Sequence, residues 1–308
     1  MATGGFPEAV VVRGGPSALR PPAFPGLLAA TYELTGHVNK PPPFRQYFAP
    51  GYVPQARQVN AGRIVQALVG TLTVMLTGLV GYLLWGRRIG LWALAISALY
   101  LPLILLGFTL YSEPLFIACE MAALACLLRL RSSDSVRKRW AIAAGVMVGF
   151  AWLTRSNDFV LVLPMVLLSW TDRPRFSRRA LVLPALAVLA TLVTVAPWTI
   201  RNANVMHAFV PVSDNSGYIL AGTYNETART DPHFRGWRPA QEDPADNRLI
   251  ISSAGELDQS RRLGSAARRE IRAHPPYVFT VAFCNGATPV PGCRVRRPWS
   301  SNFLQIPG

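Results

Sequence analysis

Three arginines stand at the borders of apolar or rigid stretches of this chain. Arg20 precedes a Pro-Pro pair, Arg155 separates two short apolar runs, and Arg201 follows the long apolar run 180–199. A guanidinium group is planar and offers a fork of N–H donors that matches phosphate oxygens. Arg155 is therefore a candidate contact for an anion such as a phosphate. Arg201 lies at the outer end of its run, where positive charge is less expected, and Arg20 stands in a rigid loop. The alternative for Arg201 is that it marks the end of an apolar run.

Other polar residues accompany these arginines. Glu113, in Tyr-Ser-Glu-Pro, is the carboxylate of a loop that otherwise carries no charge. Ionisable groups at membrane depth are costly and are usually functional or paired, so Glu113 is a candidate catalytic residue; the alternative is a solvated loop glutamate. Asp158 is a candidate ligand contact, or it forms a local ion pair with Arg155.

The composition indicates a membrane protein. Lys and Arg number 31 against 16 Asp and Glu, a net charge of +15, yet 51% of residues are hydrophobic and only 15% are charged. Disordered chains lack apolar residues, so extensive disorder is excluded. Residues 62–200 are the most apolar part of the chain and also carry the largest net positive charge, with 13 basic against 5 acidic residues. This pattern argues against a nucleic-acid partner and is typical of membrane segments joined by short basic loops.

The apolar runs predict an all-α, polytopic transmembrane helix bundle with an extracytoplasmic polar segment. A span needs about 20 apolar residues, and the two runs around Arg155 are shorter, so they could form a re-entrant hairpin. The positive-inside rule places eleven basic residues in cytoplasmic loops, whereas the two outer loops between the predicted spans hold one, Arg155. The predicted membrane segments are 64–85, 89–107, 114–128, 140–153, 159–170 and 180–199.

Four regions follow from this topology. Residues 1–61 are predicted to be an extracytoplasmic loop remnant, and residues 62–200 the transmembrane bundle with about six membrane segments. Residues 201–283 are an extracytoplasmic segment with a basic surface helix at 258–273 and the start of a further span. Residues 284–308 form an atypical tail. There is no nucleotide-binding loop and no metal-ligand spacing, so no cofactor or metal site is identified and a divalent metal requirement stays open.

A series of short motifs then resembles a known family. In order, it comprises Arg-Pro-Pro-Ala-Phe-Pro at 20–25, Gly-Arg-Arg at 86–88, Ser-Glu at 112–113, Leu-Thr-Arg at 153–155, Pro-Trp-Thr-Ile-Arg-Asn at 197–202, Phe-Val-Pro-Val-Ser at 209–213 and Ala-His-Pro at 273–275. The series resembles membrane glycosyltransferases of the GT-C superfamily, near the dolichyl-phosphate-mannose–protein mannosyltransferase family (family 39) and its bacterial relatives. The resemblance covers about residues 18–283.

The resemblance implies a mannosyltransferase-like hexosyltransferase, multi-pass in the plasma (inner) membrane and in contact with membrane lipid. It would move a sugar from a polyprenyl-phosphate carrier to a protein, lipid or glycan acceptor on the extracytoplasmic side. Arg155, Asp158, Arg201 and Asn202 would contact the substrates, with the two arginines on the carrier phosphate. Arg20 would lie near the acceptor, and Glu113 would line the site as the catalytic carboxylate.

The chain also departs from the family pattern. Family members carry a first span and then an acidic motif early in the first outer loop, which supplies the catalytic base. Glu8 does not stand in a matching motif. We therefore expect the chain to correspond to a fragment. Two other classes stay open: a polytopic transporter or flippase-like protein, which would show paired repeats, and a non-catalytic remnant.

Overall fold

The computed structural model describes residues 17–36, 56–132, 136–171, 177–230, 237 and 240–286, and every regular element in these ranges is a helix. The predicted all-α fold is therefore confirmed for this part of the chain. The described helices belong to two compact units. Unit 1 is formed by residues 20–212. Unit 2 is formed by residues 213–286 together with the short segment 17–19.

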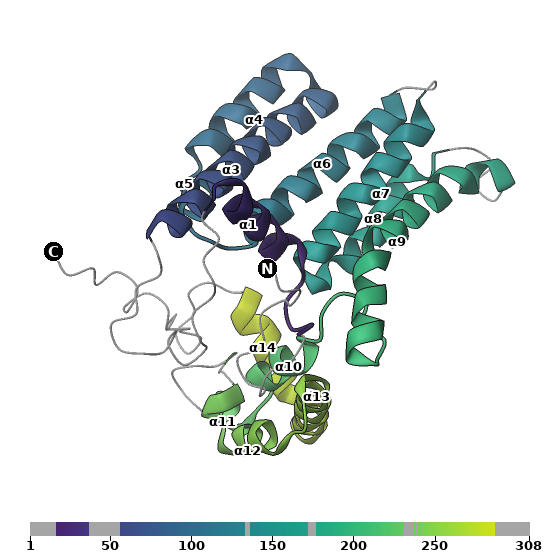
Figure 1. Cartoon of the computed structure of the whole chain (residues 1–308). Helices are drawn as coiled ribbons and strands as arrows, with labels where there is room; N and C mark the ends of the chain where they lie inside the picture. Colours follow the sequence, from purple (N-terminus) through teal and green to yellow (C-terminus); the bar gives the residue numbers. More distant parts are fainter. Residues whose placement is uncertain are drawn as a thin grey trace. The chain divides into compact units, whose positions relative to one another are not determined.

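Unit 1 contains the apolar helices (Figure 1). All six predicted apolar runs fall on helices of this unit. Its elements are α1 (Ala23–Leu34), α3 (Ala56–Trp85), α4 (Arg87–Leu99), α5 (Leu101–Phe108), α6 (Glu113–Ser132), α7 (Arg137–Thr154), the 3-10 helix η1 (Ser156–Leu161), α8 (Val162–Ser169) and α9 (Arg178–Met206).

Two described helices are long and apolar enough to cross a membrane, Val59–Trp85 of α3 and Arg178–Met206, which is α9. Helices α4 and α5 together are apolar enough to be a third candidate, but they are bent by 54° at Tyr100. They count as a third span only if the bent pair crosses the membrane as one segment. Pro102 follows this break, and its ring prevents a continuous helical hydrogen-bond ladder. The remaining predicted segments, on α6, α7 and η1–α8, stay a prediction.

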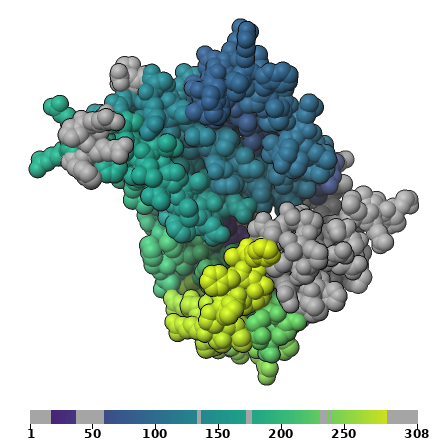
Figure 2. Space-filling model, turned by 180° about the vertical axis from the view of Figure 1, so that it is seen from behind, coloured from purple at the N-terminus to yellow at the C-terminus, as the bar shows by residue number. Residues whose placement is uncertain are grey.

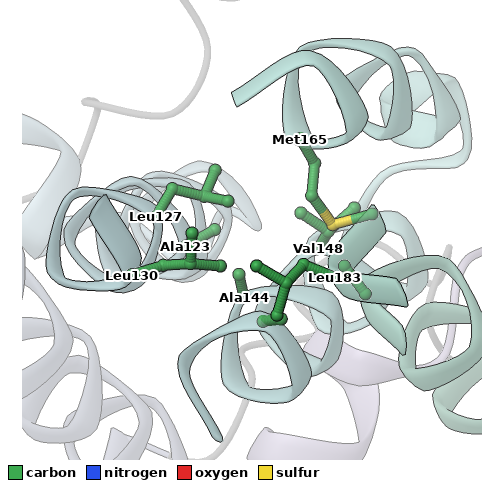
Figure 3. Packing of buried hydrophobic residues seen from close by; sticks show 9 residues of the cluster. Ala123, Leu127, Leu130, Ala144, Val148, Met165 and Leu183 are labelled. Atoms are coloured by element: carbon green, nitrogen blue, oxygen red, sulfur yellow. The ribbon is translucent and has the colours of Figure 1, made fainter. Parts of the chain in front are cut away.

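Helices α6, α7 and α9 pack around one apolar core, to which α8 contributes Met165 (Figure 3). The α7–α9 contact is unusually close. Gly145 and Gly149 of α7 lie against Ala187 and Thr194 of α9, leaving no room for a side chain at either glycine. Small residues four apart allow such close backbone approach in membrane helices. The larger core residues are Leu127, Leu130, Val148, Met165 and Leu183.

The helix directions in unit 1 alternate, so its helix ends fall into two groups. Gln66 of α3 donates to the carbonyl oxygen of Thr109 at 3.2 Å, which brings the start of α3 to the loop before α6. At the opposite group of ends, Arg131 of α6 donates to the carbonyl oxygen of Leu168 at 3.0 Å. This second group carries most of the basic residues described in unit 1: Arg87, Arg88, Arg129, Arg131, Arg137, Lys138, Arg139, Arg178 and Arg179. The predicted loop arginines 173 and 175 lie outside the described residues.

Unit 2 is built from short helices around α13. Leu263 of α13 is fully buried and packs with Ala221, Ala240 and Ile250. Glu256, at the start of α13, accepts hydrogen bonds from Ser17 Oγ at 2.6 Å and from the backbone N–H of Ala18 at 2.8 Å. The elements are α10 (Ser216–Thr223), α11 (Glu226–Thr230), η2 (Ala240–Glu242), α12 (Pro244–Ser252), α13 (Glu256–Ala273) and α14 (Pro275–Gly286). Helix α13 confirms the helix predicted at 258–273.

Two neighbouring aspartates at the start of α12 have opposite electrostatic surroundings. Asp246 is only 5% exposed, and its Oδ2 has no hydrogen-bond partner among the described residues. Burial, with the nearby charges of Asp243 and Glu270, raises the pKa of Asp246 to about 7. Burial also acts on Asp243, but hydrogen bonds from Thr227, Ala245 and Asp246 outweigh it and hold the pKa of Asp243 below its usual value.

We expect the Asp246→Asn variant to be more stable than the wild type at pH 8, by roughly 1–3 kcal/mol. In the unfolded chain the carboxyl ionises near pH 4, whereas in the fold its pKa is about 7. The stability of the wild type therefore falls as pH rises between these values, and the advantage of the variant shrinks towards pH 4. Thermal unfolding of the full chain in detergent at pH 5 and pH 8 measures this.

Asp243→Asn is the matched control, and its effect has the opposite sign. The ionised form of Asp243 is favoured by the fold, so its stabilisation is present above the unfolded pKa and is lost as pH falls. This variant should therefore be less stable than the wild type at pH 8. An Asp246→Asn variant that gains nothing at pH 8 would contradict the assignment.

Candidate functional site

The candidate site is built on a small apolar cluster in unit 1. Leu153 at the end of α7, Val195 in α9 and Val212 after α9 are buried against one another. Ala23, at the start of α1, and Trp198 of α9 pack against this cluster. Segments that are far apart in the sequence therefore meet here.

The cluster brings the three predicted arginines to the same group of helix ends. Arg20 precedes Ala23 by three residues, Arg155 follows Leu153 by two, and Arg201 follows Trp198 by three. The arrangement depends on α7 ending beside the part of α9 around Val195 and Trp198. The chain before α1 must also return to this point.

The chain after α9 folds back along the last turns of that helix. His207 ends α9 in the left-handed region, with φ 50°, which reverses the chain direction. Trp198 Nε1 donates to the carbonyl oxygen of Val212 at 2.7 Å, and Thr199 Oγ1 donates to that of Pro211 at 2.8 Å. These bonds fix the returning segment against the helix.

Asn202 adds further hydrogen bonds between α9 and the returning segment, on the buried side of the helix. Its side chain is fully buried, and Nδ2 donates to the carbonyl oxygens of Val210 at 3.0 Å and Val212 at 3.4 Å. Asn202 was predicted to contact a substrate directly. Its geometry instead supports a positioning role, because both of its donor contacts and its Oδ1 are used within the chain.

Arg201 is held by two contacts with its own helix. Its guanidinium lies over the Trp198 ring, 4.7 Å from the centroid, and Nη1 donates to Asn202 Oδ1 at 3.0 Å. A cation over an indole face is stabilised by the ring quadrupole. The partly buried guanidinium is therefore oriented before any ligand binds.

Arg155 pairs with Glu113, not with Asp158. The Arg155 Nη1 to Glu113 Oε1 distance is 3.0 Å, and both side chains are about two-fifths exposed. Arg155 also lies over the Phe116 ring, at 5.7 Å. The alternative of a local Arg155–Asp158 ion pair is thus not realised; only the Asp158 backbone N–H bonds to Arg155, at its carbonyl oxygen. Asp158 Oδ2 is buried and has no hydrogen-bond partner in the described part of the chain.

Sequence reasoning did not identify Phe116 or Thr199 as parts of this site. Phe116 stands three residues after Glu113 on α6, a spacing that places both on one helix face, and this signal was available. The contact of Thr199 with Pro211 depends on the reversal at His207, which has no clear signature in the sequence. Arg20 is exposed, and Glu8 lies outside the described residues.

Within the described ranges, no three His, Cys, Asp or Glu side chains are grouped so that they could hold a metal ion. The site therefore consists of cationic, carboxylate and aromatic groups at one group of helix ends. Together with the apolar helices, it defines the chain as a helical membrane protein.

A comparison with protein families identifies the class further. The family model of dolichyl-phosphate-mannose-protein mannosyltransferase matches residues 19–210, which is well over half of the chain. The chain belongs to this family of mannosyltransferase-type glycosyltransferases, and the predicted resemblance is confirmed over these residues. The match coincides with the described residues of unit 1, which end at Val212. No curated protein matches the chain. No solved structure matches it either.

Proposed function

We propose that this chain transfers a sugar from a polyprenyl-phosphate carrier to an acceptor hydroxyl on the extracytoplasmic side of a membrane. The observation that carries the proposal is the meeting of Arg20, Arg155 and Arg201 at one group of helix ends, within the region that matches the family. The family description names a dolichyl-phosphate-mannose donor and a protein acceptor. A mannosyl donor and a protein hydroxyl are therefore the first substrates to test, with lipid and glycan acceptors after them.

The arginines have a definite task in this reaction. The acceptor oxygen forms a bond to the anomeric carbon while the bond from that carbon to the carrier's phosphate oxygen breaks. The electron pair stays on the phosphate, whose negative charge grows in the transition state. Arg201 and Arg155 would stabilise that charge because they are oriented in advance by Trp198 and Glu113. Arg20 would lie near the acceptor.

The hydroxyl proton must pass to a base, and Glu113 is better placed for this than Asp158. Glu113 uses Oε1 for Arg155, and Oε2 makes no hydrogen bond with the described part of the chain. Its side chain is 38% exposed, so an acceptor can approach it. Asp158 Oδ2 is buried and would have to move to reach a hydroxyl. Asp158 would instead shape the donor site beside Arg155.

The charge distribution favours one orientation. The helix ends opposite the candidate site carry most of the basic residues described in unit 1. Basic loops stay on the cytoplasmic side, so the candidate site would face the other side. We propose the plasma membrane as the location, with the multi-pass topology predicted above.

Transfer of labelled mannose from a polyprenyl-phosphate donor to a peptide with a free hydroxyl, by the full chain in membranes, tests the proposed function. We expect Glu113→Gln to lose about 10²-fold or more in turnover, because general base catalysis contributes at this level. Asp158→Asn should retain most of the turnover and chiefly raise the KM for the donor.

The alternatives give different results in the same assay. A wild-type chain that binds the carrier without transferring sugar would favour the non-catalytic remnant. Movement of the carrier between leaflets without transfer would favour the flippase-like class. A larger loss in turnover for Asp158→Asn than for Glu113→Gln would reassign the base to Asp158.

A further inference from the structure

Helix α13 of unit 2 presents a stripe of arginines that the proposed transfer reaction does not use. The arginine stripe consists of Arg261, Arg262, Arg268, Arg269 and Arg272, all of which are exposed. With 3.6 residues per turn, these positions fall within about one third of the helix circumference. The helix is therefore cationic along one side over most of its length.

This positive charge is hardly neutralised within the described part of the chain. Arg262 pairs with Asp258 at 2.9 Å, at an exposed position. Arg261 lies near the charges of Asp214 and Asp258 but forms no ion pair with a described residue, and neither do Arg268, Arg269 and Arg272. Glu270, on the opposite side of α13, accepts instead from Arg229 at 2.7 Å and lies 3.2 Å from His274.

Helix α13 cannot rotate about its axis to bury the arginine stripe, because its opposite face is packed in unit 2. Leu263 and Ala267 are buried in unit 2, and Gln259 donates to the carbonyl oxygen of Ile250 at 3.0 Å. The backbone of Gly217 packs so closely on Ser260 that a Cβ at Gly217 would lie 2.0 Å from the Ser260 carbonyl oxygen. The arginines are thus presented outward by a packed scaffold.

An apolar surface follows the stripe directly. Helix α14 begins at Pro275, three residues after Arg272. It is the segment coloured yellow in Figure 2. It exposes Phe279 (76%) and Phe283 (60%), which are one helical turn apart. A cationic helix followed at once by exposed aromatic residues is the pattern of a segment that lies at a membrane–water interface.

We propose that the arginine stripe of α13 binds the headgroups of anionic phospholipids. Each guanidinium can donate two parallel bonds to a lipid phosphate, and basic side chains near an anionic bilayer surface each strengthen binding. Lipid is the partner that the observations favour over an acidic protein or a nucleic acid. The apolar helices of unit 1 keep the chain in a bilayer, so lipid phosphates are always available to it, and α14 continues the stripe into an apolar surface.

Arginine modification by phenylglyoxal, read residue by residue by mass spectrometry, tests this proposal on the full chain in nanodiscs. One set of discs contains only phosphatidylcholine, and the other contains about one third phosphatidylglycerol. We expect the four unpaired arginines of the stripe to react several-fold more slowly in the anionic discs. Arg248, an exposed arginine on α12 outside the stripe, is the internal control and should react equally in both.

A triple variant, Arg268→Gln with Arg269→Gln and Arg272→Gln, provides a second measurement. It should retain fewer phosphatidylglycerol molecules than the wild type after purification, and Arg261 should lose most of its protection in anionic discs. Equal labelling rates of the stripe in both kinds of disc would overturn the proposal. So would protection by soluble polyphosphate in neutral discs without protection by anionic lipid. Neither readout requires sugar transfer, so the proposal stands or falls independently of the proposed function.

Discussion

Replacing Arg201 with alanine should lower the rate of sugar transfer by about 10²–10³-fold, because it removes an oriented cation from the departing phosphate. The side chain is already positioned by Trp198 and Asn202, so it contributes without a reorganisation cost at the moment of reaction. The loss should appear in turnover more than in the KM for the donor, since the phosphate charge grows towards the transition state. Initial rates with a labelled polyprenyl-phosphate donor measure both quantities.

Two further variants separate this role from a structural one. Arg201→Lys keeps the charge but loses the planar fork, so we expect an intermediate loss. Arg129→Ala removes an exposed arginine from the other group of helix ends in unit 1 and should leave the rate unchanged. Thermal unfolding of Arg201→Ala should stay close to that of the wild type. If Arg201→Ala turned over like the wild type, the phosphate role would have to be abandoned.

Gly145→Ala should be strongly destabilising, by about 3 kcal/mol or more, although alanine is the better helix former. The new Cβ would lie 2.1 Å from the carbonyl oxygen of Ala187, which is backbone and cannot rotate away. Thr191 Oγ1 stabilises the same α7–α9 contact by donating to the carbonyl oxygens of Gly145 at 2.9 Å and Ala187 at 3.0 Å. Helices α7 and α9 would have to move apart. This movement would also increase the distance between Arg155, which follows α7, and Arg201, which lies on α9.

Gly70→Ala is the matched control, since Gly70 also lies inside a helix but has no atom within 4 Å of a Cβ built there. It should be neutral or stabilising by up to about 1 kcal/mol. Thermal unfolding in detergent reports the two stabilities, and the transfer rate well below the unfolding temperature reports the site. A Gly145→Ala chain with unchanged stability would show that α7 and α9 are not held at this distance.

The positions of the helices could be predicted well because apolar runs in this chain are long and are interrupted by charges or proline. The runs at 64–85 and 180–199 became α3 and α9, and the basic helix at 258–273 became α13. The break between α4 and α5 was not predicted, although Pro102 was visible, because a proline near the end of a run does not specify a bend of 54°. The Gly-x-x-x-Gly spacing at Gly145 and Gly149 is also visible in the sequence. The sequence does not show, however, that α9 is the helix that packs against it.

For the candidate site, too, the residue types could be selected from the sequence, whereas their contacts could not. Arg155, Arg201 and Glu113 were selected from the sequence because charges at the borders of apolar runs are costly and therefore informative. Arg20 was selected because its proline-rich motif resembles the family. The ion pair of Arg155 with Glu113, 42 residues away, was not predicted, and neither was the burial of Asn202. Local spacing left open whether Asp158 pairs with Arg155 or contacts a ligand, and Asn202 was expected to contact a substrate.

By itself the sequence determined the helical class, the apolar segments and which polar residues were candidates for chemistry, because hydropathy and charge act over short distances along the chain. Only the tertiary structure decided which of those residues share a site and which partner each one has. That outcome depends on the close contact of α7 with α9 at Gly145 and on the chain reversal at His207. Contacts between distant segments are set by the packing of whole helices, which no local pattern records.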